Sequence, residues 1–298
     1  MPVETAIFPV AGLGTRILPA TKVVPKELLP VVDKPILQYA VEEAAEAGIR
    51  RMVFVVGRGK ALIADHFGKA YELETELERR GRDELLHLVR SVLPKGVACL
   101  YVRQEEPLGL GHAVLCARSA AGNGTFAVVL PDDLIWAERP VLQQMVEVFE
   151  EYWGAVVAVE PVPQEETGRY GIVAPKEQLS PRLSRISALV EKPAPEEAPS
   201  RLAIVGRYLL PPDIWPHLAD LKPGAGGELQ LTDAIAALLK TTPVYAYRFE
   251  GVRYDCGTRI GYLKAQVDLG LKHPEVGPHL AHHLKGLFGS EGSHESPL

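Results

Sequence analysis

The sequence predicts an α/β protein whose central sheet is largely parallel and covered by helices. Two observations carry this prediction. Short apolar segments alternate with helical segments through the first half of the chain, and the first apolar segment runs directly into a glycine-rich loop. Such alternation predicts parallel strands, because each return to a parallel neighbour needs a crossover that is usually a helix. The 298 residues suffice for one large domain of this class or two small ones.

The individual elements follow from the spacing of apolar residues and from turn signals. In the first half we expect strands at 5–10, 51–56, 97–103 and 125–130, and helices at 35–47, 60–67, 71–89 and 112–117. In the second half we expect a strand at 155–160, strands of an added sheet at 169–174 and 185–191, and helices at 228–240 and 259–271. The most charged run, 72–84, is typical of a solvated helix stabilised by charge pairs one turn apart.

The bulk composition is that of a soluble globular protein, with 47% hydrophobic and 23% charged residues. A net charge of −6 disfavours binding to nucleic acid or to an acidic membrane, since both attract basic surfaces. No apolar run reaches the roughly 18 residues of a membrane helix, and the N-terminus lacks the basic residues of a signal peptide. We therefore expect a cytoplasmic protein, and its three cysteines, none in a C-x-x-C pair, are expected to be reduced thiols.

Residues 11–30, AGLGTRILPATKVVPKELLP, form the most informative stretch. Glycines after a strand let backbone N–H groups approach an anion closely, and Arg16 and Lys26 add positive charge. Ile17 stands where a dinucleotide fingerprint needs a third small residue. Lys60 follows a glycine but precedes alanine instead of the serine or threonine of a Walker loop. The stretch therefore suits a nucleoside triphosphate that is bound by a loop other than a dinucleotide fingerprint or a Walker loop.

The motif G-x-G-T-R followed by a distal P-K resembles the signature of the sugar-1-phosphate nucleotidylyltransferases. The resemblance runs from Val3 to about Lys272 and includes YGIV at 170–173, VEKP at 190–193 and GELQLTDA at 227–234. It implies a Rossmann-like nucleotidyltransferase fold, with a mixed, mostly parallel central sheet flanked by helices and a smaller added sheet over the sugar site. Within the family, the string GTRILPATKVVPKELLPVVDKPILQY is similar to the members that use UTP.

The resemblance implies that a uridylyl group passes from UTP to α-D-glucose 1-phosphate, giving UDP-glucose and pyrophosphate, with Mg²⁺ as cofactor. It also implies a homodimer or homotetramer, and no nucleic acid or membrane partner is expected. A single domain is expected over residues 1–288, with a nucleotide-binding part at about 1–135 and a sugar-binding part at about 136–272. Residues 289–298 are expected to form a flexible tail.

The reaction needs cations on the phosphates and hard oxygen ligands for the metal. By resemblance, Arg16 grips the outgoing β- and γ-phosphates and Lys26 lies at the reacting phosphate. Two acids, Asp132 and Asp133, follow a predicted strand, and one of them is expected to reach the metal, because adjacent residues of an extended chain point to opposite sides. The family pattern indicates Asp132, whereas Asp133 replaces the expected apolar residue and either competes or caps the following segment. Asp255, in a D-x-G segment, is the second expected ligand or a nearby organiser.

The resemblance assigns nucleotide binding to residues of the glycine loop and of the segment after the third predicted strand: Ala11, Gly12, Gly14, Thr15, Glu27, Gln104 and Gly109. A glutamine amide both donates and accepts, so Gln104 can satisfy two atoms of a uracil edge, and Glu27 can accept from the ring N3–H or position a neighbour. His112 is expected to be structural, because an ionised acceptor phosphate needs no general base.

The sugar phosphate is assigned by resemblance to Gly171, Glu191 and Lys192. Glu191 would accept hydrogen bonds from sugar hydroxyls, Lys192 would bind the phosphate, and Gly171 would leave room for the ring.

Two alternatives stay open. dTTP or ATP could be the donor, although glutamine typically follows the basic residue in thymidylyl-transferring relatives, so Glu27 favours uridylyl transfer. A non-catalytic sugar-nucleotide-binding regulatory subunit would usually have lost a charged residue of the phosphate or metal site. Here all of them are present: Arg16, Lys26, Asp132, Lys192 and Asp255.

Overall fold

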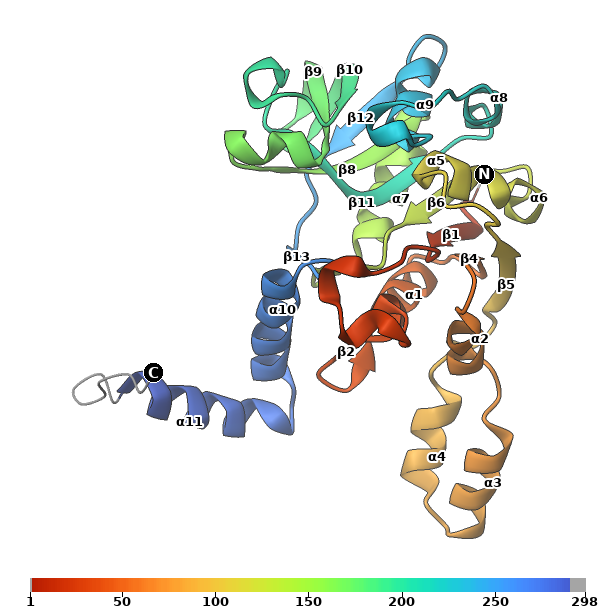
Figure 1. The fold of residues 1–298 in the computed structure, drawn as a ribbon, viewed down its shortest axis with the longest axis vertical. Coiled ribbons are helices and arrows are strands. Elements are labelled where there is room, and N and C mark those ends of the chain that lie inside the picture. Colours follow the sequence, from red (N-terminus) through yellow and green to blue (C-terminus); the bar gives the residue numbers. More distant parts are fainter. Residues whose placement is uncertain (1, 290–298) are drawn as a thin grey trace.

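A nine-stranded sheet organises the chain (Figure 1). The computed structural model describes residues 2–289. In spatial order the strands are β5 (Ala98–Arg103), β4 (Arg51–Val56), β1 (Thr5–Pro9), β6 (Phe126–Val129), β11 (Leu202–Leu210), β8 (Ala155–Pro161), β12 (Val244–Tyr247), β10 (Leu183–Glu191) and β9 (Gly171–Ser180). The pairings are parallel from β5 to β6 and between β8 and β12, and antiparallel elsewhere. The expected mixed α/β sheet is confirmed, but it is not largely parallel, because the pairings from β6 to β8 and from β12 to β9 are antiparallel.

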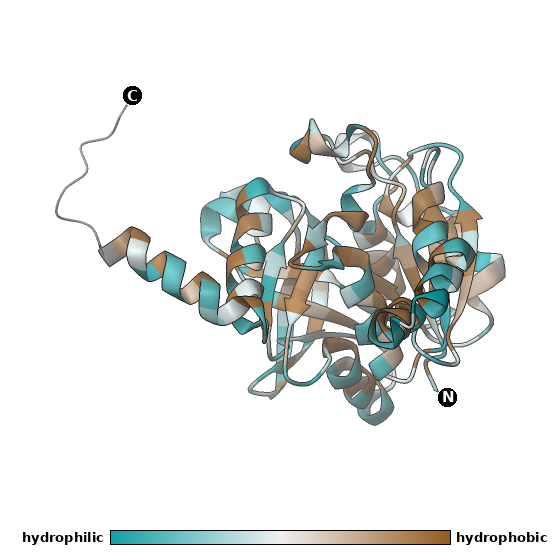
Figure 2. Cartoon of the chain, turned by 90° about the horizontal axis from the view of Figure 1, so that it is seen from below, coloured by the Kyte–Doolittle hydropathy of each residue, from teal (hydrophilic) through white to brown (hydrophobic). Residues whose placement is uncertain are grey.

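Helices cover both faces of this sheet, because successive strand residues point to opposite sides. Ile7 belongs to a core cluster that includes residues of α5 (Leu110–Cys116), α6 (Arg118–Ala121), α8 (Ile214–Ala219) and α9 (Leu231–Leu238). Its neighbour Phe8 belongs to the cluster on the other face, with α1 (Ile36–Glu46), α2 (Ala61–Phe67) and α7 (Val141–Tyr152). Figure 2 shows the resulting concentration of hydrophobic residues on the central strands.

Two small sheets lie beside the central one. β2 (Pro30–Val31) pairs with β3 (Lys34–Pro35), and β7 (Asp133–Trp136) pairs with β13 (Val252–Asp255). The strands expected at 169–174 and 185–191 are β9 and β10, and they are joined to the edge of the central sheet instead of forming an added one. The reason is that β10 pairs with β12 as well as with β9.

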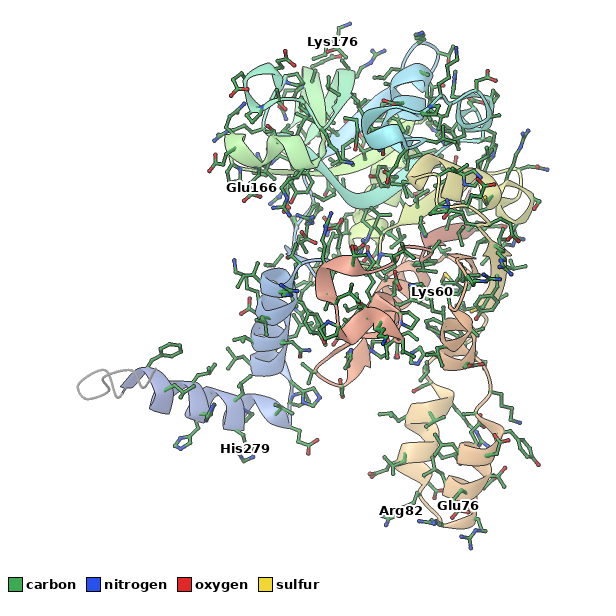
Figure 3. All side chains as sticks on the ribbon, in the orientation of Figure 1. Lys60, Glu76, Arg82, Glu166, Lys176 and His279 are labelled. Atoms are coloured by element: carbon green, nitrogen blue, oxygen red, sulfur yellow. The ribbon has the colours of Figure 1, made fainter. Side chains whose placement is uncertain are left out.

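Two helical pairs project from this body (Figure 1). α3 (Tyr71–Arg79) and α4 (Asp83–Arg90) form a hairpin, and Glu76 and Arg82 lie near its far end (Figure 3). The single helix expected at 71–89 is wrong, because the chain turns at Gly81, which adopts a left-handed φ of 65°. α10 (Arg259–Lys272) packs against β13 and β2, and α11 (Val276–Gly289) follows it. Gly289 therefore ends a helix, and the rest of the predicted tail, 290–298, lies outside the described residues.

Between residues 2 and 289 the structure contains no helix with the length and apolar character needed to cross a membrane. Cys99, Cys116 and Cys256 are free thiols, as expected.

Candidate active site

A cavity of about 490 Å³ opens at the carboxyl ends of β1, β4 and β5. Ala11 and Gly12 follow β1, residues 57–60 follow β4, and Gln104 follows β5, while residues 21–26 form most of the remaining wall. The three strands are parallel neighbours, so their carboxyl ends meet at one edge, where α/β sheets bind ligands. We call this the nucleotide cavity, because most of its lining comes from the glycine loop and the residues predicted to bind nucleotide.

Glycines let the loop after β1 fold closely around Lys26. Gly14 adopts a left-handed φ of 66°, and Thr21 Oγ1 donates to its carbonyl oxygen at 2.6 Å. A Cβ on Gly12 would lie 3.7 Å from Lys26 Cε, so glycine leaves the ammonium group open to the cavity beside the backbone. Gly14 and Thr15 shape this loop and line neither cavity of the site.

A second cavity, of about 500 Å³, is lined by Arg16, Asp132 and Asp255 together with the predicted sugar-phosphate residues. We call it the acceptor cavity. The two cavities meet at one ion pair, because Lys26 lines the first, Asp132 lines the second, and Lys26 Nζ lies 2.5 Å from Asp132 Oδ2.

Burial and pairing act against each other in this ion pair. Burial disfavours the charged form of both groups, but at Lys26 the carboxylates of Asp132 and Glu27 together outweigh it, and the pKa of the amine is raised. Likewise, burial alone would raise the pKa of Asp132, but the Lys26 ammonium, a backbone hydrogen bond and the charge of Arg16 together outweigh it, and that pKa is lowered. Both groups are therefore charged near neutral pH, and the junction of the cavities holds a full positive and a full negative charge.

The small sheet of β7 and β13 brings Asp132 and Asp255 together. Asp133 pairs in register with Asp255, and the Cys256 N–H donates to the Asp132 carbonyl oxygen at 2.7 Å. A Cβ on Gly257 would lie 2.9 Å from Asp132 Oδ2 and 3.1 Å from Asp255 Oδ1. Both carboxylates therefore reach the space that Gly257 leaves open.

Two converging carboxylates suit a hard divalent cation, which typically takes one or two of them and completes its coordination with substrate phosphates and water. Within residues 2–289 there is no group of three or more His, Cys, Asp or Glu side chains arranged to hold a metal. The family of the chain, described below, generally uses a divalent metal, and Asp132 and Asp255 are the residues here that fit one.

Asp133, unlike Asp132, has an arginine as its partner. Arg253 Nε donates to Asp133 Oδ1 at 2.5 Å, and Arg253 Nη1 donates to Glu160 Oε1 at 2.6 Å. Burial, opposed by Arg253 and reinforced by the charge of Asp132, raises the pKa of Asp133 to about 6. Asp133 begins β7, and its side chain ties that strand to β13 through Arg253 instead of capping the following segment.

The predicted sugar-phosphate residues lie together where β9 begins and β10 ends. Gly171 pairs in register with Glu191, and a Cβ on Gly171 would lie 3.1 Å from Glu191 Oε2 and 2.9 Å from Thr232 Oγ1. Lys192 adopts φ 46°, a conformation that is strained for a residue with a side chain. Its Nζ lies 3.5 Å from Glu191 Oε1, and its side chain is 42% exposed against 12% for Glu191. The ammonium group is thus available to a ligand, while the carboxylate is largely enclosed.

Of the predicted base-binding residues, Gln104 lines the nucleotide cavity, whereas Gly109 and Glu27 do not. Glu27 is 1% exposed, and Lys60 Nζ donates to its Oε2 at 2.8 Å. Burial raises the pKa of Glu27 against the opposing charges of Lys60 and Lys26. Of the two roles considered for Glu27, the geometry favours positioning a neighbour, and that neighbour is Lys60, whose side chain lines the cavity.

Lys60, Arg169 and Arg253 line the two cavities and were not among the predicted site residues. Lys60 follows a predicted strand at its carboxyl end, so its position could have identified it. Arg169 immediately precedes the YGIV motif, and its Nη2 lies 3.3 Å from Asp255 Oδ2 in the acceptor cavity. The pairing of Arg253 with Asp133 had no signal in the sequence, because it depends on which strand lies beside β7.

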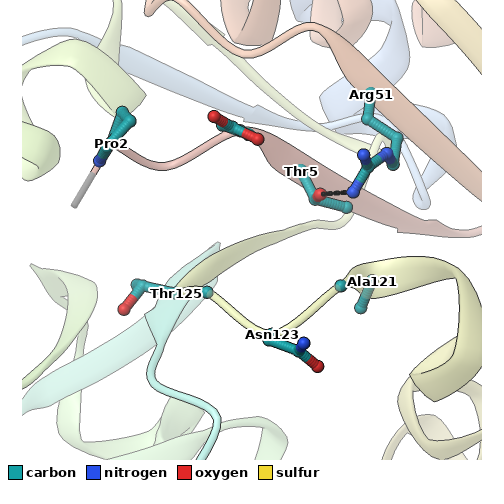
Figure 4. A pocket seen from close by; sticks show the side chains of 9 residues that line it. Pro2, Thr5, Arg51, Ala121, Asn123 and Thr125 are labelled. Carbon is teal, nitrogen blue, oxygen red and sulfur yellow. Dashed lines mark hydrogen bonds between the residues drawn. The ribbon is translucent and has the colours of Figure 1, made fainter.

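A further cavity, of about 210 Å³, lies at the opposite, amino-terminal edge of the same strands (Figure 4). Thr5 begins β1, Arg51 begins β4, and Arg51 Nη1 donates to Thr5 Oγ1 at 3.4 Å. None of the predicted site residues lines this cavity, so the nucleotide and acceptor cavities form the candidate site.

Known proteins share this architecture. The family model described as Nucleotidyl transferase matches residues 6–270. The UTP–glucose-1-phosphate uridylyltransferase of Bacillus subtilis (strain 168) is 46% identical over 290 residues, which cover 97% of this chain and 98% of that protein. A UTP-bound UGPase from Acinetobacter baumannii is 42% identical, with a TM-score of 0.88 and coverage of 95% of this chain and 98% of that chain. A UDP-glucose pyrophosphorylase complexed with UDP-glucose is also 42% identical, with a TM-score of 0.83 and coverage of 91% and 100%. The chain belongs to the nucleotidyl transferase family.

Proposed function

We propose that this chain transfers the uridylyl group of UTP to α-D-glucose 1-phosphate, giving UDP-glucose and pyrophosphate. One observation supports the proposal: the ammonium group of Lys26 and the carboxylate of Asp132 form an ion pair where the nucleotide cavity meets the acceptor cavity, and we assign phosphate binding to the first and metal binding to the second. The similar proteins support the choice of substrates, since one is UTP-bound and another is complexed with UDP-glucose.

The nucleotide is proposed to lie in the first cavity with its base toward Gln104 and its phosphates toward Lys26. Gly12 lets the backbone after Ala11 approach the phosphates, because no side chain stands between them. Arg16 lines the acceptor cavity and faces the junction from that side, where its planar fork suits the outgoing β- and γ-phosphates. Gly14, Thr15 and Gly109 are proposed to support nucleotide binding through the shape of their loops.

The sugar phosphate is proposed to lie in the acceptor cavity. Glu191 accepts hydrogen bonds from sugar hydroxyls, the exposed Lys192 ammonium binds the phosphate, and Gly171 leaves space for the ring. A phosphate oxygen of the acceptor attacks the α-phosphorus in line, the bond to the β-phosphate oxygen breaks, and pyrophosphate leaves. No general base is needed, because a phosphate monoester loses its second proton near pH 6. Catalysis then rests on positioning and charge, as in other phosphoryl transfers.

Asp132 and Asp255 are proposed to hold Mg²⁺, which would supply positive charge to the reacting phosphates. Lys26 provides a second positive charge at the same junction and already contacts the carboxylate that would bind the ion.

The test is pyrophosphate release from glucose 1-phosphate and Mg²⁺ with each of UTP, dTTP, ATP, CTP and GTP. Release with UTP well above the others is the expected result. Release mainly with dTTP or ATP would keep the mechanism and replace the donor. If a folded, metal-loaded protein releases no pyrophosphate with any donor, the result would favour the non-catalytic regulatory subunit and overturn the proposal.

The assembly stays a prediction of the resemblance, and the cellular location stays a prediction from the sequence. A homodimer or homotetramer in the cytoplasm is expected, and sedimentation of the purified protein would measure the first.

A further inference from the structure

The side-chain amide of Gln104 has a fixed polarity in this structure. Its nitrogen Nε2 lies 3.2 Å from the carbonyl oxygen of Gly109 and 3.0 Å from Nδ1 of His112. A backbone carbonyl can only accept a hydrogen bond, so the amide nitrogen must face it, and the reversed orientation would bring two oxygens together. The two amide hydrogens are therefore both committed within the protein.

His112 completes this arrangement through its own tautomer. Because Gln104 donates to Nδ1, that ring nitrogen carries no hydrogen and the ring proton is on Nε2. Nε2 lies 3.7 Å from Cys116 Sγ, a weak acceptor one turn further along α5. The position of His112 on α5 thus presents a lone pair to Gln104.

What remains for a ligand is the amide oxygen. Gln104 is 7% exposed and lines the nucleotide cavity, and with both hydrogens engaged its Oε1 is the free polar atom of the amide. An oxygen accepts and cannot donate, so the atom of the base that lies against it must carry a hydrogen. Uracil and thymine carry one on N3. N3 of cytosine carries a lone pair and its nearest hydrogens are on the exocyclic amino group at C4, so cytosine donates to the oxygen only from a shifted position.

We propose that His112 is a positioning residue that engages the second amide hydrogen of Gln104, leaves only the amide oxygen for the base and thereby selects a 4-oxo pyrimidine over cytosine. This inference rests on the proposed function, which places the donor base at Gln104. It also revises the expectation that one glutamine satisfies two atoms of the uracil edge, because only the oxygen is available. The arrangement does not separate uracil from thymine, since both present the same N3–H.

The test compares kcat/KM for UTP, CTP and dTTP in the native protein and in His112→Leu, which offers no lone pair. Without that partner one amide hydrogen is released while the Gly109 carbonyl still holds the other, so the amide of Gln104 gains a donor that it can offer to N3 of cytosine. The UTP-to-CTP ratio is expected to fall about tenfold to a hundredfold, the usual worth of one such hydrogen bond. The UTP-to-dTTP ratio is expected to stay unchanged. Binding of UMP and CMP, measured by calorimetry, should show the same loss of preference without involving the chemical step.

Two further variants make the result specific. In His112→Asn the Oδ1 atom is attached to Cγ as Nδ1 is in histidine, so an acceptor is restored and the UTP-to-CTP ratio should largely recover. His66→Leu removes a similar pair, in which His66 Nε2 lies 3.0 Å from Gln38 Oε1, and neither residue lines the nucleotide or acceptor cavity. That control should keep the native ratio.

A folded His112→Leu variant with an unchanged UTP-to-CTP ratio would overturn the proposal, as would an equal loss in His66→Leu. If the leucine variant does not fold, the asparagine variant decides, because a ratio well below the native one would contradict the role of an acceptor. Measurements on the native protein distinguish a failure of the proposed function from a failure of the role given to His112. Failure to use UTP at all would refute the proposed function, whereas a UTP preference that survives His112→Leu refutes only the role of His112.

Discussion

Replacement of Gly12 by alanine tests the central feature of the nucleotide cavity, which is the close approach of backbone and phosphate. The added Cβ would meet only Lys26, at 3.7 Å from Cε and 4.0 Å from Nζ, and both distances are ordinary van der Waals contacts. The φ angle of Gly12 lies outside the left-handed range, unlike that of Gly14 at 66°. We therefore expect Gly12→Ala to fold, with a change in unfolding free energy below about 1 kcal/mol.

The effect on activity should be much larger. A phosphate oxygen bound to a backbone N–H lies about 2.9 Å from the nitrogen, and a methyl carbon keeps an oxygen at roughly 3.3 Å or more. The new methyl group would push the phosphate away from the loop and from Lys26. Loss of one hydrogen bond to a charged group costs about 1.5–3 kcal/mol, so kcat/KM for UTP should fall roughly tenfold to 150-fold.

The assay is pyrophosphate release with UTP and glucose 1-phosphate, together with thermal unfolding of the same samples. Gly124→Ala is the matched control, because no atom lies within 4 Å of its Cβ position and it lines the cavity at the opposite edge of the sheet. An unchanged kcat/KM in folded Gly12→Ala would refute the reasoning, since the triphosphate would then not approach this backbone. A large loss of stability would refute the packing argument.

Three other variants test the metal site, the core and the pH dependence. Asp132→Asn should lower turnover at least a hundredfold with an unchanged circular dichroism spectrum, and full activity would contradict its role as ligand. Arg207→Met should cost about 3–5 kcal/mol in urea unfolding, because Arg207 is 1% exposed and its loss leaves Glu43 buried without the Nη2 contact at 2.7 Å. The exposed pair of Arg139 and Glu147 should contribute less than about 1 kcal/mol. Burial raises the pKa of Asp133 to about 6, above the unfolded value of about 3.9. The protonated carboxyl group therefore stabilises the folded state in full below pH 4, and this contribution is lost as the pH rises through 6. The stability of the native protein relative to Asp133→Asn should therefore fall by up to about 3 kcal/mol between pH 4 and 7.5.

Local sequence signals predicted the elements that position the site. Apolar runs of strand length and the helical segments between them lie where expected in the first half, within one or two residues at most ends. The glycines after β1 and the acids after β6 are at the carboxyl edge of the sheet, because chain direction alone places the residues that follow parallel strands there. The hairpin of α3 and α4 departs from expectation at Gly81, whose turn a charge pattern does not report.

These local signals do not predict contacts between segments that are far apart in the sequence. The partner of Glu27 is Lys60, on the loop after β4, and the pair is visible only once β1 and β4 are neighbours. The edge strands β9 and β10 were expected in a separate sheet, because a hairpin carries no sign of the strand it will pair with next.

The sequence by itself determined the fold class and several of the charged residues available to the reaction, since both depend on short-range patterns: a strand, the glycine loop that follows it, and a cation a few residues further along. Only the tertiary structure decided how two adjacent acids divide their roles. Asp132 meets Lys26 at the junction of the cavities, and Asp133 meets Arg253. The physical reason is that β7 pairs with β13, which brings Arg253 and Asp255 beside them from the far end of the chain.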